Sequence, residues 1–222
     1  MQSFTDLLID IDGTLTDTKE VERQALKKLF ELYDIKFSND LINKYSQINE
    51  SLWLEFEKGK ITKDVLRIKR FEILFKDIEN KLNIIKFAKE YFKLYSKTVI
   101  ETKNAVNTIM LLFKKYNLHI ISNGSTDVQY YKLEKMGIKD CFKNIFLSEE
   151  IGYAKPDQRF FDFVYDNIKQ KNKEKVAVIG DSISADIKGG KQFGFKTIYV
   201  GNEKTNCANY SIKSFDEISN IL

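Results

Sequence analysis

The spacing of apolar side chains divides the chain into a helical stretch and a stretch in which helices and strands alternate. Residues 7–11 form a short apolar run of branched side chains, which predicts a buried strand. Between about Thr18 and Ser96, apolar residues recur at intervals of three, four and seven, as on amphipathic helices. Gly59 interrupts this series, and Thr62 is a typical residue for the start of the next helix. The long segment is therefore predicted to hold several helices and no strand.

From about Asn104 onward, strands and helices alternate. The predicted strands span residues 118–122, 145–147, 176–180 and 196–200. The predicted helices span residues 105–116, 127–136, 158–168, 185–193 and 214–221. This alternation is typical of a parallel sheet covered by helices on both faces. We therefore expect an α/β protein, with a Rossmann-like parallel sheet and a helical domain inserted after the first strand.

The expected domain boundaries follow from this change of pattern. Residues 1–16 and 99–222 are assigned to the α/β core domain, and residues 17–98 to the helical domain. Hydrophobic residues make up 43% of the chain and charged residues 31%, which is typical of a globular protein rather than a disordered one. The chain is long enough to bury a sizeable core without disulfides or metal staples.

Charge and hydropathy exclude several classes of partner. The chain has 36 Lys and Arg against 32 Asp and Glu, a net charge of +4 without a basic block, so no nucleic-acid partner is expected. No apolar run approaches the roughly 18 residues of a membrane span. The first residues lack the basic and apolar regions of a signal peptide, so a cytoplasmic location is expected.

The few cysteines and the single histidine limit the possible chemistry. Cys141 and Cys207 stand far apart and outside any CxxC motif, which disfavours a disulfide framework and a zinc site. Any histidine-dependent mechanism would have to use His119. That residue lies inside a predicted strand, so we expect it to serve in packing.

Polar side chains gather where the predicted strands end. In an open parallel sheet, ligands bind outside the carboxyl ends of the strands. Three carboxylates with a fourth nearby, a hydroxyl, an amide and a lysine follow four of the predicted strands. These side chains belong to Asp10, Asp12, Ser122, Asn123, Lys155, Asp181 and Asp186.

This set of side chains suits the chemistry of a phosphoryl group. Close carboxylates repel one another unless a cation lies among them, and oxygen ligands without a His or Cys cluster favour Mg²⁺. A metal ion and Lys155 would offset the charge on phosphoryl oxygens. One carboxylate can then act as the nucleophile and form an aspartyl-phosphate.

Four short segments resemble, in order, the four motifs of the haloacid dehalogenase (HAD) superfamily. They are Asp10-Ile11-Asp12-Gly13-Thr14-Leu15, Ser122-Asn123-Gly124, Lys155-Pro156, and Gly180-Asp181-Ser182 with Asp186. Singly, each segment is also explained by an ordinary turn, a helix N-cap or a solvated loop. Together they identify the chain as similar to this superfamily over about residues 7–200, and the helical insertion resembles the superfamily's cap domain.

The resemblance implies roles for the acidic residues. Asp10 would be the nucleophile and a Mg²⁺ ligand. Asp12 would protonate the leaving oxygen, then activate water, and bind Mg²⁺ through its backbone carbonyl. Asp181 would be a further Mg²⁺ ligand, and Asp186 would support Lys155 or metal-bound water. Because an alkoxide leaving group needs an acid and a halide does not, Asp12 favours a phosphatase over a dehalogenase.

The remaining motif residues would handle the phosphoryl group. By the resemblance, Ser122 and the Asn123 amide would hold its oxygens, and Lys155 would neutralise both the nucleophile and the phosphate. The expected enzyme is therefore a phosphoric monoester hydrolase that acts on a small-molecule ester, as a monomer or weak homodimer.

The choice of ester is expected to depend on the helical insertion. Residues 46–62 and 148–157 resemble the YjjG-type pyrimidine 5′-nucleotidases, although Gly13 stands where many members have a second Asp. The resemblance implies a (pyrimidine) nucleoside 5′-monophosphate as substrate. The alternatives are a phosphatase or phosphotransferase acting on a sugar phosphate or phosphoglycolate and, more remotely, a non-catalytic binding module.

Asn49, Trp53 and Phe56 share one face of a predicted helix and are candidates for substrate specificity. A base can stack on an aromatic ring while an amide reads its edge. The alternative is that Trp53 and Phe56 pack the inside of the helical insertion.

Overall fold

A computed structural model of the chain describes residues 4–76, 82–202 and 205–222. Residues 1–3, which belong to the segment that lacks signal-peptide features, lie outside the described residues. The chain forms two compact units, one from Met1–Asp17 and Val99–Leu222 and the other from Thr18–Thr98. Among the described residues, no helix combines the length and the apolarity needed to cross a bilayer.

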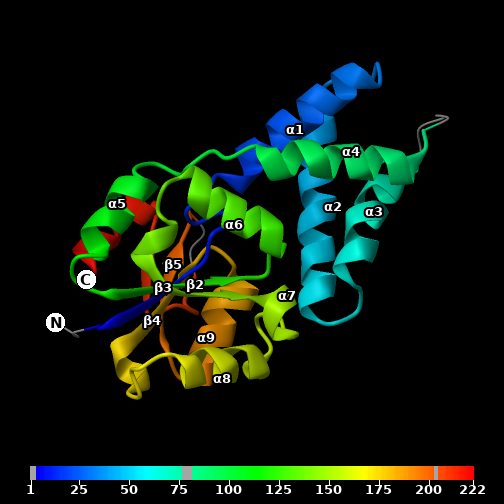
Figure 1. The fold of residues 1–222 in the computed structure, drawn as a ribbon. Helices are drawn as coiled ribbons and strands as arrows, with labels where there is room; N and C mark the ends of the chain where they lie inside the picture. Colours follow the sequence, from blue (N-terminus) through cyan, green and yellow to red (C-terminus); the bar gives the residue numbers. More distant parts are fainter. Residues whose placement is uncertain (1–3, 77–81, 203–204) are drawn as a thin grey trace. The chain divides into compact units, whose positions relative to one another are not determined.

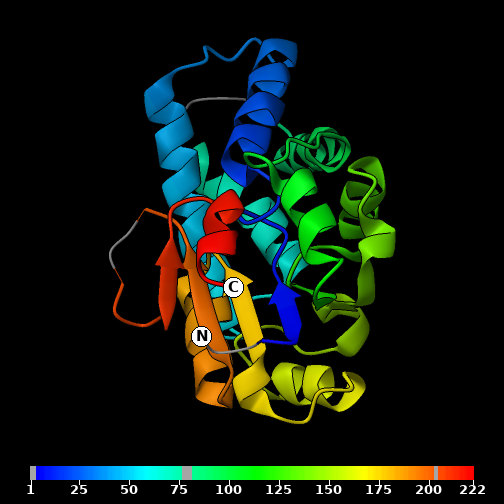
Figure 2. The ribbon, with the colours of Figure 1, turned by 90° about the vertical axis from the view of Figure 1, so that its left-hand side faces the viewer.

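The first unit is built on a six-stranded sheet in which all pairings are parallel. The strands lie in the order β3-β2-β1-β4-β5-β6. Figure 2 shows β1, β4 and β6 pointing the same way. The strand bounds are β1 (Asp6–Ile9), β2 (Asn117–Ser122), β3 (Phe142–Leu147), β4 (Val176–Gly180), β5 (Lys196–Val200) and β6 (Tyr210–Ile212). Because β1 lies between β2 and β4, the residues that follow it emerge at the middle of the sheet's carboxyl edge.

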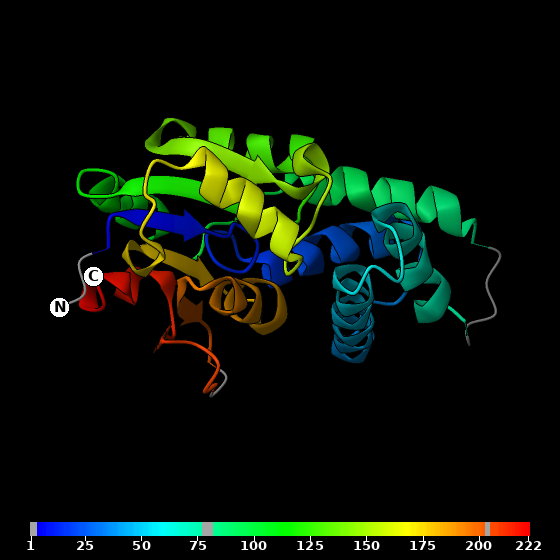
Figure 3. The same cartoon turned by 90° about the horizontal axis from the view of Figure 1, so that it is seen from below.

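Helices cover both faces of this sheet, which confirms the predicted fold class. Leu7 and Ile9 belong to a core shared with α5 and α6, whereas the intervening Leu8 belongs to a second core shared with α8. Figures 1 and 3 show α8 lying across one face of the sheet. The helix bounds are α5 (Ala105–Leu112), α6 (Thr126–Lys135), α7 (Ser148–Ile151), α8 (Gln158–Asn167) and α9 (Gly189–Phe193). The 3₁₀ segments of this unit among the described residues are η1 (Lys139–Cys141), η2 (Lys173–Lys175) and η4 (Phe215–Asn220).

Several element boundaries differ from the predicted ones. The helix predicted over residues 185–193 is instead a π-helical segment, η3 (Ile183–Lys188), followed by the short α9. The wider π turn accompanies an inward-facing Asp186, whose carboxylate accepts from the Ser182 N–H at 3.1 Å. The strand β6 was not predicted, because three residues at a sheet edge carry too little periodicity to be seen. The predicted closing helix is the 3₁₀ turn η4.

His119 confirms its expected packing role. It lies on β2, which has neighbours on both sides, and its side chain is buried. Its Nε2 lies 3.1 Å from Asp6 Oδ1, and the Asn144 side-chain amide lies 3.0 Å from its Nδ1. Both ring nitrogens are thus used within the sheet.

The second unit consists of α1 (Thr18–Leu32), α2 (Asn39–Glu57), α3 (Lys63–Leu74) and α4 (Ile84–Lys97). Helices α2 and α3 run side by side (Figure 1). Thr62 begins α3 as predicted, since its hydroxyl accepts from the Val65 N–H at 3.3 Å. The core of this unit is aromatic, with Phe71 in ring contact with Phe87 at 5.0 Å and with Tyr91 at 5.1 Å.

Candidate active site

Asp10 follows β1 directly and anchors the candidate site. Its backbone N–H donates to the Ile179 carbonyl at 2.9 Å, which holds the residue against β4. The turn beyond it is closed by the Leu15 N–H, which donates to the Ile11 carbonyl at 2.9 Å. Burial raises the pKa of the Asp10 carboxyl to about 7; Lys155 opposes that rise, while the charges of nearby carboxylates add to it.

Lys155 is the cation at the centre of the site, and its side chain is only 2% exposed. Its Nζ donates to Asp10 Oδ1 at 2.8 Å, to Asp186 Oδ1 at 2.6 Å and to the Ile121 carbonyl at 2.9 Å. Burial alone would lower the pKa of Lys155, but the two carboxylates raise it above its usual range. The ammonium group therefore remains charged and joins strands β1 and β2 to η3.

Asn123 and Ser122 shape the loop that follows β2. The side-chain Nδ2 of Asn123 donates to the Lys155 carbonyl at 2.8 Å, and its Oδ1 accepts from the Lys155 N–H at 2.9 Å. The side-chain amide of Asn123 is thus used to fix the backbone of Lys155, which leaves the phosphoryl role expected of the Asn123 amide to the backbone N–H. The buried Ser122 hydroxyl accepts from the Gly124 N–H at 3.0 Å.

Three of the predicted carboxylates meet in one place. One oxygen from each of Asp10, Asp181 and Asp186 lies within 4.8 Å of the other two. Crowding by protein atoms, and then the charges of Asp10 and Asp186, raise the pKa of Asp181 well above its usual range, although its side chain keeps an exposed face. The repulsion and the all-oxygen donor set both fit a small divalent cation such as Mg²⁺.

Gly13 leaves room for one of these carboxylates. Its φ is +81°, and a Cβ added there would lie 2.0 Å from Asp181 Oδ2. Any side chain at this position would therefore displace Asp181.

Asp12 has two partners that sequence analysis missed. Gln129 Nε2 donates to Asp12 Oδ2 at 2.5 Å, and Lys132 Nζ donates to Asp12 Oδ1. Both partners come from α6 and are spaced by three residues, which places them on one side of the helix. Their signal in the sequence is weak: Gln129 and Lys132 neighbour the apolar Val128 and Leu133 on the face that is buried.

The specificity candidates belong to α2 in the second unit. Asn49 is buried, with its Nδ2 donating to Glu22 Oε1 at 2.8 Å and its Oδ1 accepting from Arg70 Nη1 at 3.3 Å. Its amide is thus used inside the helical unit. Trp53 and Phe56 are partly exposed and form an edge-to-face pair with ring centroids 5.5 Å apart.

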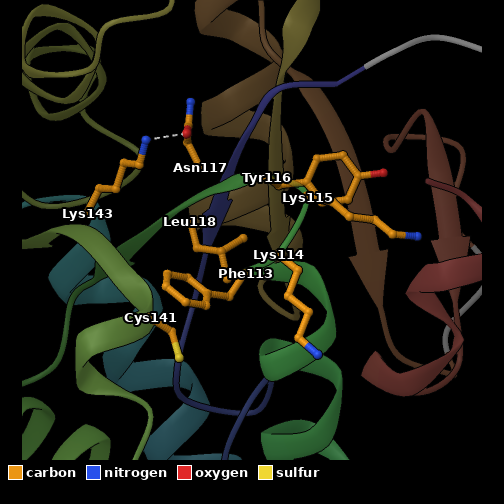
Figure 4. A pocket seen from close by; sticks show the side chains of 8 residues that line it. All are labelled: Phe113, Lys114, Lys115, Tyr116, Asn117, Leu118, Cys141 and Lys143. Carbon is orange, nitrogen blue, oxygen red and sulfur yellow. Dashed lines mark hydrogen bonds between the residues drawn. The ribbon is translucent and has the colours of Figure 1, made fainter.

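A cavity of about 220 Å³ lies elsewhere in the first unit (Figure 4). It is lined by residues 113–118 with Cys141 and Lys143, so it opens where β2 begins. Figure 4 shows the Lys143 ammonium donating to Asn117 across one wall. The carboxylate cluster follows the opposite ends of the strands, and this cavity is therefore separate from the candidate site.

The family follows from this fold and this arrangement of motifs: the chain belongs to the haloacid dehalogenase-like hydrolases, whose pattern matches residues 7–194. The chain is 34% identical over 227 residues to the HAD-hydrolase YfnB of Bacillus subtilis, covering 100% of this chain and 97% of YfnB. A magnesium-bound crystal structure of YfnB superposes with a TM-score of 0.93 at 33% identity, covering 99% of this chain and 98% of that one.

Two pyrimidine 5′-nucleotidases are also similar to the chain. PynA of Streptococcus pneumoniae is 30% identical over 226 residues, which covers 97% of this chain and 94% of PynA. YjjG of Escherichia coli is 25% identical over 205 residues, which covers 89% of each chain. The predicted membership of the superfamily and the resemblance to YjjG-type proteins are thus confirmed.

Proposed function

We propose that the protein hydrolyses a phosphate monoester, namely a pyrimidine nucleoside 5′-monophosphate, with Asp10 as the nucleophile. The observation that carries this proposal is the buried contact of 2.8 Å between the Asp10 carboxylate and the Lys155 ammonium group. It sets a carboxylate at the end of the central strand, with a fixed positive charge beside it and a second acid, Asp12, two residues further on. The similarity to PynA and YjjG supports the choice of substrate.

The reaction proceeds through two displacements at phosphorus. An Asp10 oxygen attacks, the ester bond breaks, and the departing oxygen takes a proton from Asp12. Water then attacks the phosphorus of the aspartyl-phosphate and gives a proton to Asp12. The bond between phosphorus and the Asp10 oxygen breaks, so that phosphate is released and the Asp10 carboxylate is restored. Lys155 balances the negative charge that both displacements place beside Asp10.

The other motif residues bind the phosphoryl oxygens and a metal ion. The Ser122 hydroxyl and the backbone N–H of Asn123 are the donors, since the side-chain amide of Asn123 is occupied by Lys155. The carboxylates of Asp10 and Asp181 and the backbone carbonyl of Asp12 would hold Mg²⁺. When bound, Mg²⁺ supplies positive charge that offsets the phosphoryl oxygens. Asp186 supports the site through Lys155.

The two units have different roles in this proposal. Residues 1–16 and 99–222 act as the catalytic core domain, and residues 17–98 act as the cap domain that selects the ester. Within the cap domain, the partly exposed rings of Trp53 and Phe56 are the candidates for stacking on a base. Asn49 contributes indirectly, because its amide is held by Glu22 and Arg70.

A substrate panel tests this function. Purified protein with Mg²⁺ is given UMP, CMP, dUMP and TMP, and in parallel AMP, GMP, glucose 6-phosphate and phosphoglycolate. We expect phosphate release with the highest kcat/KM on pyrimidine nucleotides, and loss of release in excess chelator. A maximum on a sugar phosphate or phosphoglycolate would favour the alternative phosphatase. Absence of release from every ester, including p-nitrophenyl phosphate, would favour a non-catalytic module.

A further inference from the structure

Asp12 is held at both oxygens by side chains that have no assigned role. Gln129 Nε2 lies 2.5 Å from Asp12 Oδ2, and Lys132 Nζ donates to Oδ1. The Asp12 side chain is 28% exposed, whereas that of Lys132 is 1% exposed and Gln129 is equally buried. The partly exposed Asp12 carboxylate thus accepts hydrogen bonds from two buried side chains.

The orientation of Gln129 follows from its surroundings. A Cβ on Gly124 would lie 1.6 Å from Gln129 Nε2, so the loop after β2 packs directly on the amide. Gln129 Oε1 is buried and has no hydrogen-bond partner among the described residues. Burying an acceptor without a partner costs free energy. The hydrogen bond from Nε2 to Asp12 is therefore the favourable polar interaction that Gln129 makes in this buried position.

Burial of the Lys132 ammonium group is also unfavourable by itself. Lysine is almost never fully buried without a partner, because its ammonium group must leave water. Here the charge lies against the Asp12 carboxylate, while Leu133, the next residue along α6, belongs to the sheet core. Each carboxylate oxygen can accept two hydrogen bonds, so the bonds from α6 do not use the full acceptor capacity of the Asp12 carboxylate.

We propose that Gln129 and Lys132 are positioning residues that fix the Asp12 carboxylate for proton transfer to the leaving oxygen. This inference rests on the proposed function. Without the two donors, the Asp12 side chain would sample several rotamers at the edge of the site. A displacement of about 1 Å in a catalytic group can lower the rate by about a hundredfold. The loss should fall on the step in which Asp12 acts.

The leaving group of the substrate isolates that step. An alkyl ester such as a nucleoside monophosphate needs protonation of its leaving oxygen, whereas p-nitrophenolate departs with little need for an acid. Since kcat/KM reports the steps up to the first displacement, it excludes the later role of Asp12 in activating water. The ratio of kcat/KM for UMP to kcat/KM for p-nitrophenyl phosphate therefore measures how well Asp12 is placed.

The test compares Gln129→Met, Lys132→Met and the matched control Lys135→Met, which alters an exposed lysine on the same helix. We expect each of the first two variants to lower the ratio by about tenfold to a hundredfold. Asp12→Asn should lower it at least as far, and Lys135→Met should keep the wild-type ratio. Thermal melts confirm that each preparation is folded. If Lys132→Met does not fold, Gln129→Met remains decisive, because it removes no charge.

The outcomes separate this inference from the proposed function. An active wild-type enzyme whose two variants lose kcat/KM equally on both esters, or lose nothing, would overturn the positioning role alone. A wild-type enzyme that releases phosphate from neither ester would refute the proposed function, and the role given to Gln129 and Lys132 with it.

Discussion

Lys155→Met removes the ammonium group that lies between the buried carboxylates of Asp10 and Asp186. The wild-type side chain donates at 2.8 Å to Asp10, at 2.6 Å to Asp186 and at 2.9 Å to the Ile121 carbonyl. Methionine has a similar length and no charge, so the change leaves the carboxylates in place without their partner. Removing one member of a buried ion pair typically costs about 3–5 kcal/mol. We expect the unfolding free energy of the first unit to fall by about that amount at pH 8.

The pH dependence of this loss has a definite sign. Burial already raises the pKa of Asp10 from its ordinary value of 3.8 to about 7 in the presence of Lys155, and removal of the cation raises it further. A carboxyl whose pKa is raised in the folded state destabilises the fold as pH rises from its unfolded value through its folded value. The variant should therefore lose more stability, relative to wild type, at pH 8 than at pH 5.

The assay must report the first unit. Trp53 is the only tryptophan and lies in the helical unit, so tryptophan fluorescence would follow that unit instead. Urea unfolding in chelator, followed by far-UV circular dichroism and calorimetry, reports both units and therefore includes the first. The double variant Lys155→Met/Asp186→Asn should recover part of the lost stability, because it removes one of the two carboxylate charges that Lys155→Met leaves without their cation. A loss below about 1 kcal/mol at pH 8, or one that is the same at pH 5, would refute this reasoning.

Three further predictions concern other parts of the molecule. Burial alone would raise the pKa of Asp6, but hydrogen bonds from His119 and its neighbours hold it below its usual value. The stabilising contribution of the Asp6 carboxylate should therefore be present above about pH 4 and lost in more acidic solution. Urea unfolding at a series of acidic pH values should show the difference in stability between wild type and Asp6→Asn shrinking as the pH falls below about 4. Gly13→Ala forces a Cβ into a positive-φ position beside Asp181, and should cost about 1–3 kcal/mol in urea unfolding and raise the Mg²⁺ concentration needed for half-maximal phosphate release. Trp53→Ala should lower kcat/KM about tenfold to a hundredfold for a nucleoside monophosphate and much less for p-nitrophenyl phosphate; equal losses on both, with a lower melting temperature, would show that Trp53 only packs its own unit.

Elements with strong periodicity were predictable from the sequence. Residues 118–121 hold three branched apolar side chains and were predicted as a strand between helices, and β2 is found there. The π-helical segment was not predictable, because residues 183–188 carry the same spacing as an ordinary helix. Only the structure shows the π-helical segment, in which the Asp186 carboxylate faces Lys155. Edge strand β6 is too short to show a period at all.

The predicted site residues divide in a similar way. The carboxylates of Asp10 and Asp186 and the ammonium group of Lys155 were expected together because each follows a parallel strand at the same edge of the sheet, and the structure brings them together. Gln129 and Lys132 escaped notice because polar residues on a helix usually face water. Only the packing of α6 on the sheet shows that this face is buried.

Phosphate release by wild-type protein and by Asp10→Asn, measured side by side on UMP with Mg²⁺, tests whether Asp10 is the nucleophile. Asp10→Asn changes the charge of a buried side chain with little change in its shape, so circular dichroism should show the wild-type fold. We expect release by the wild type and none above background by the variant, because an amide cannot serve as the nucleophile that forms an aspartyl-phosphate. Wild-type rates in a folded Asp10→Asn preparation, verified by mass spectrometry, would contradict the assignment of Asp10 and the mechanism built on it.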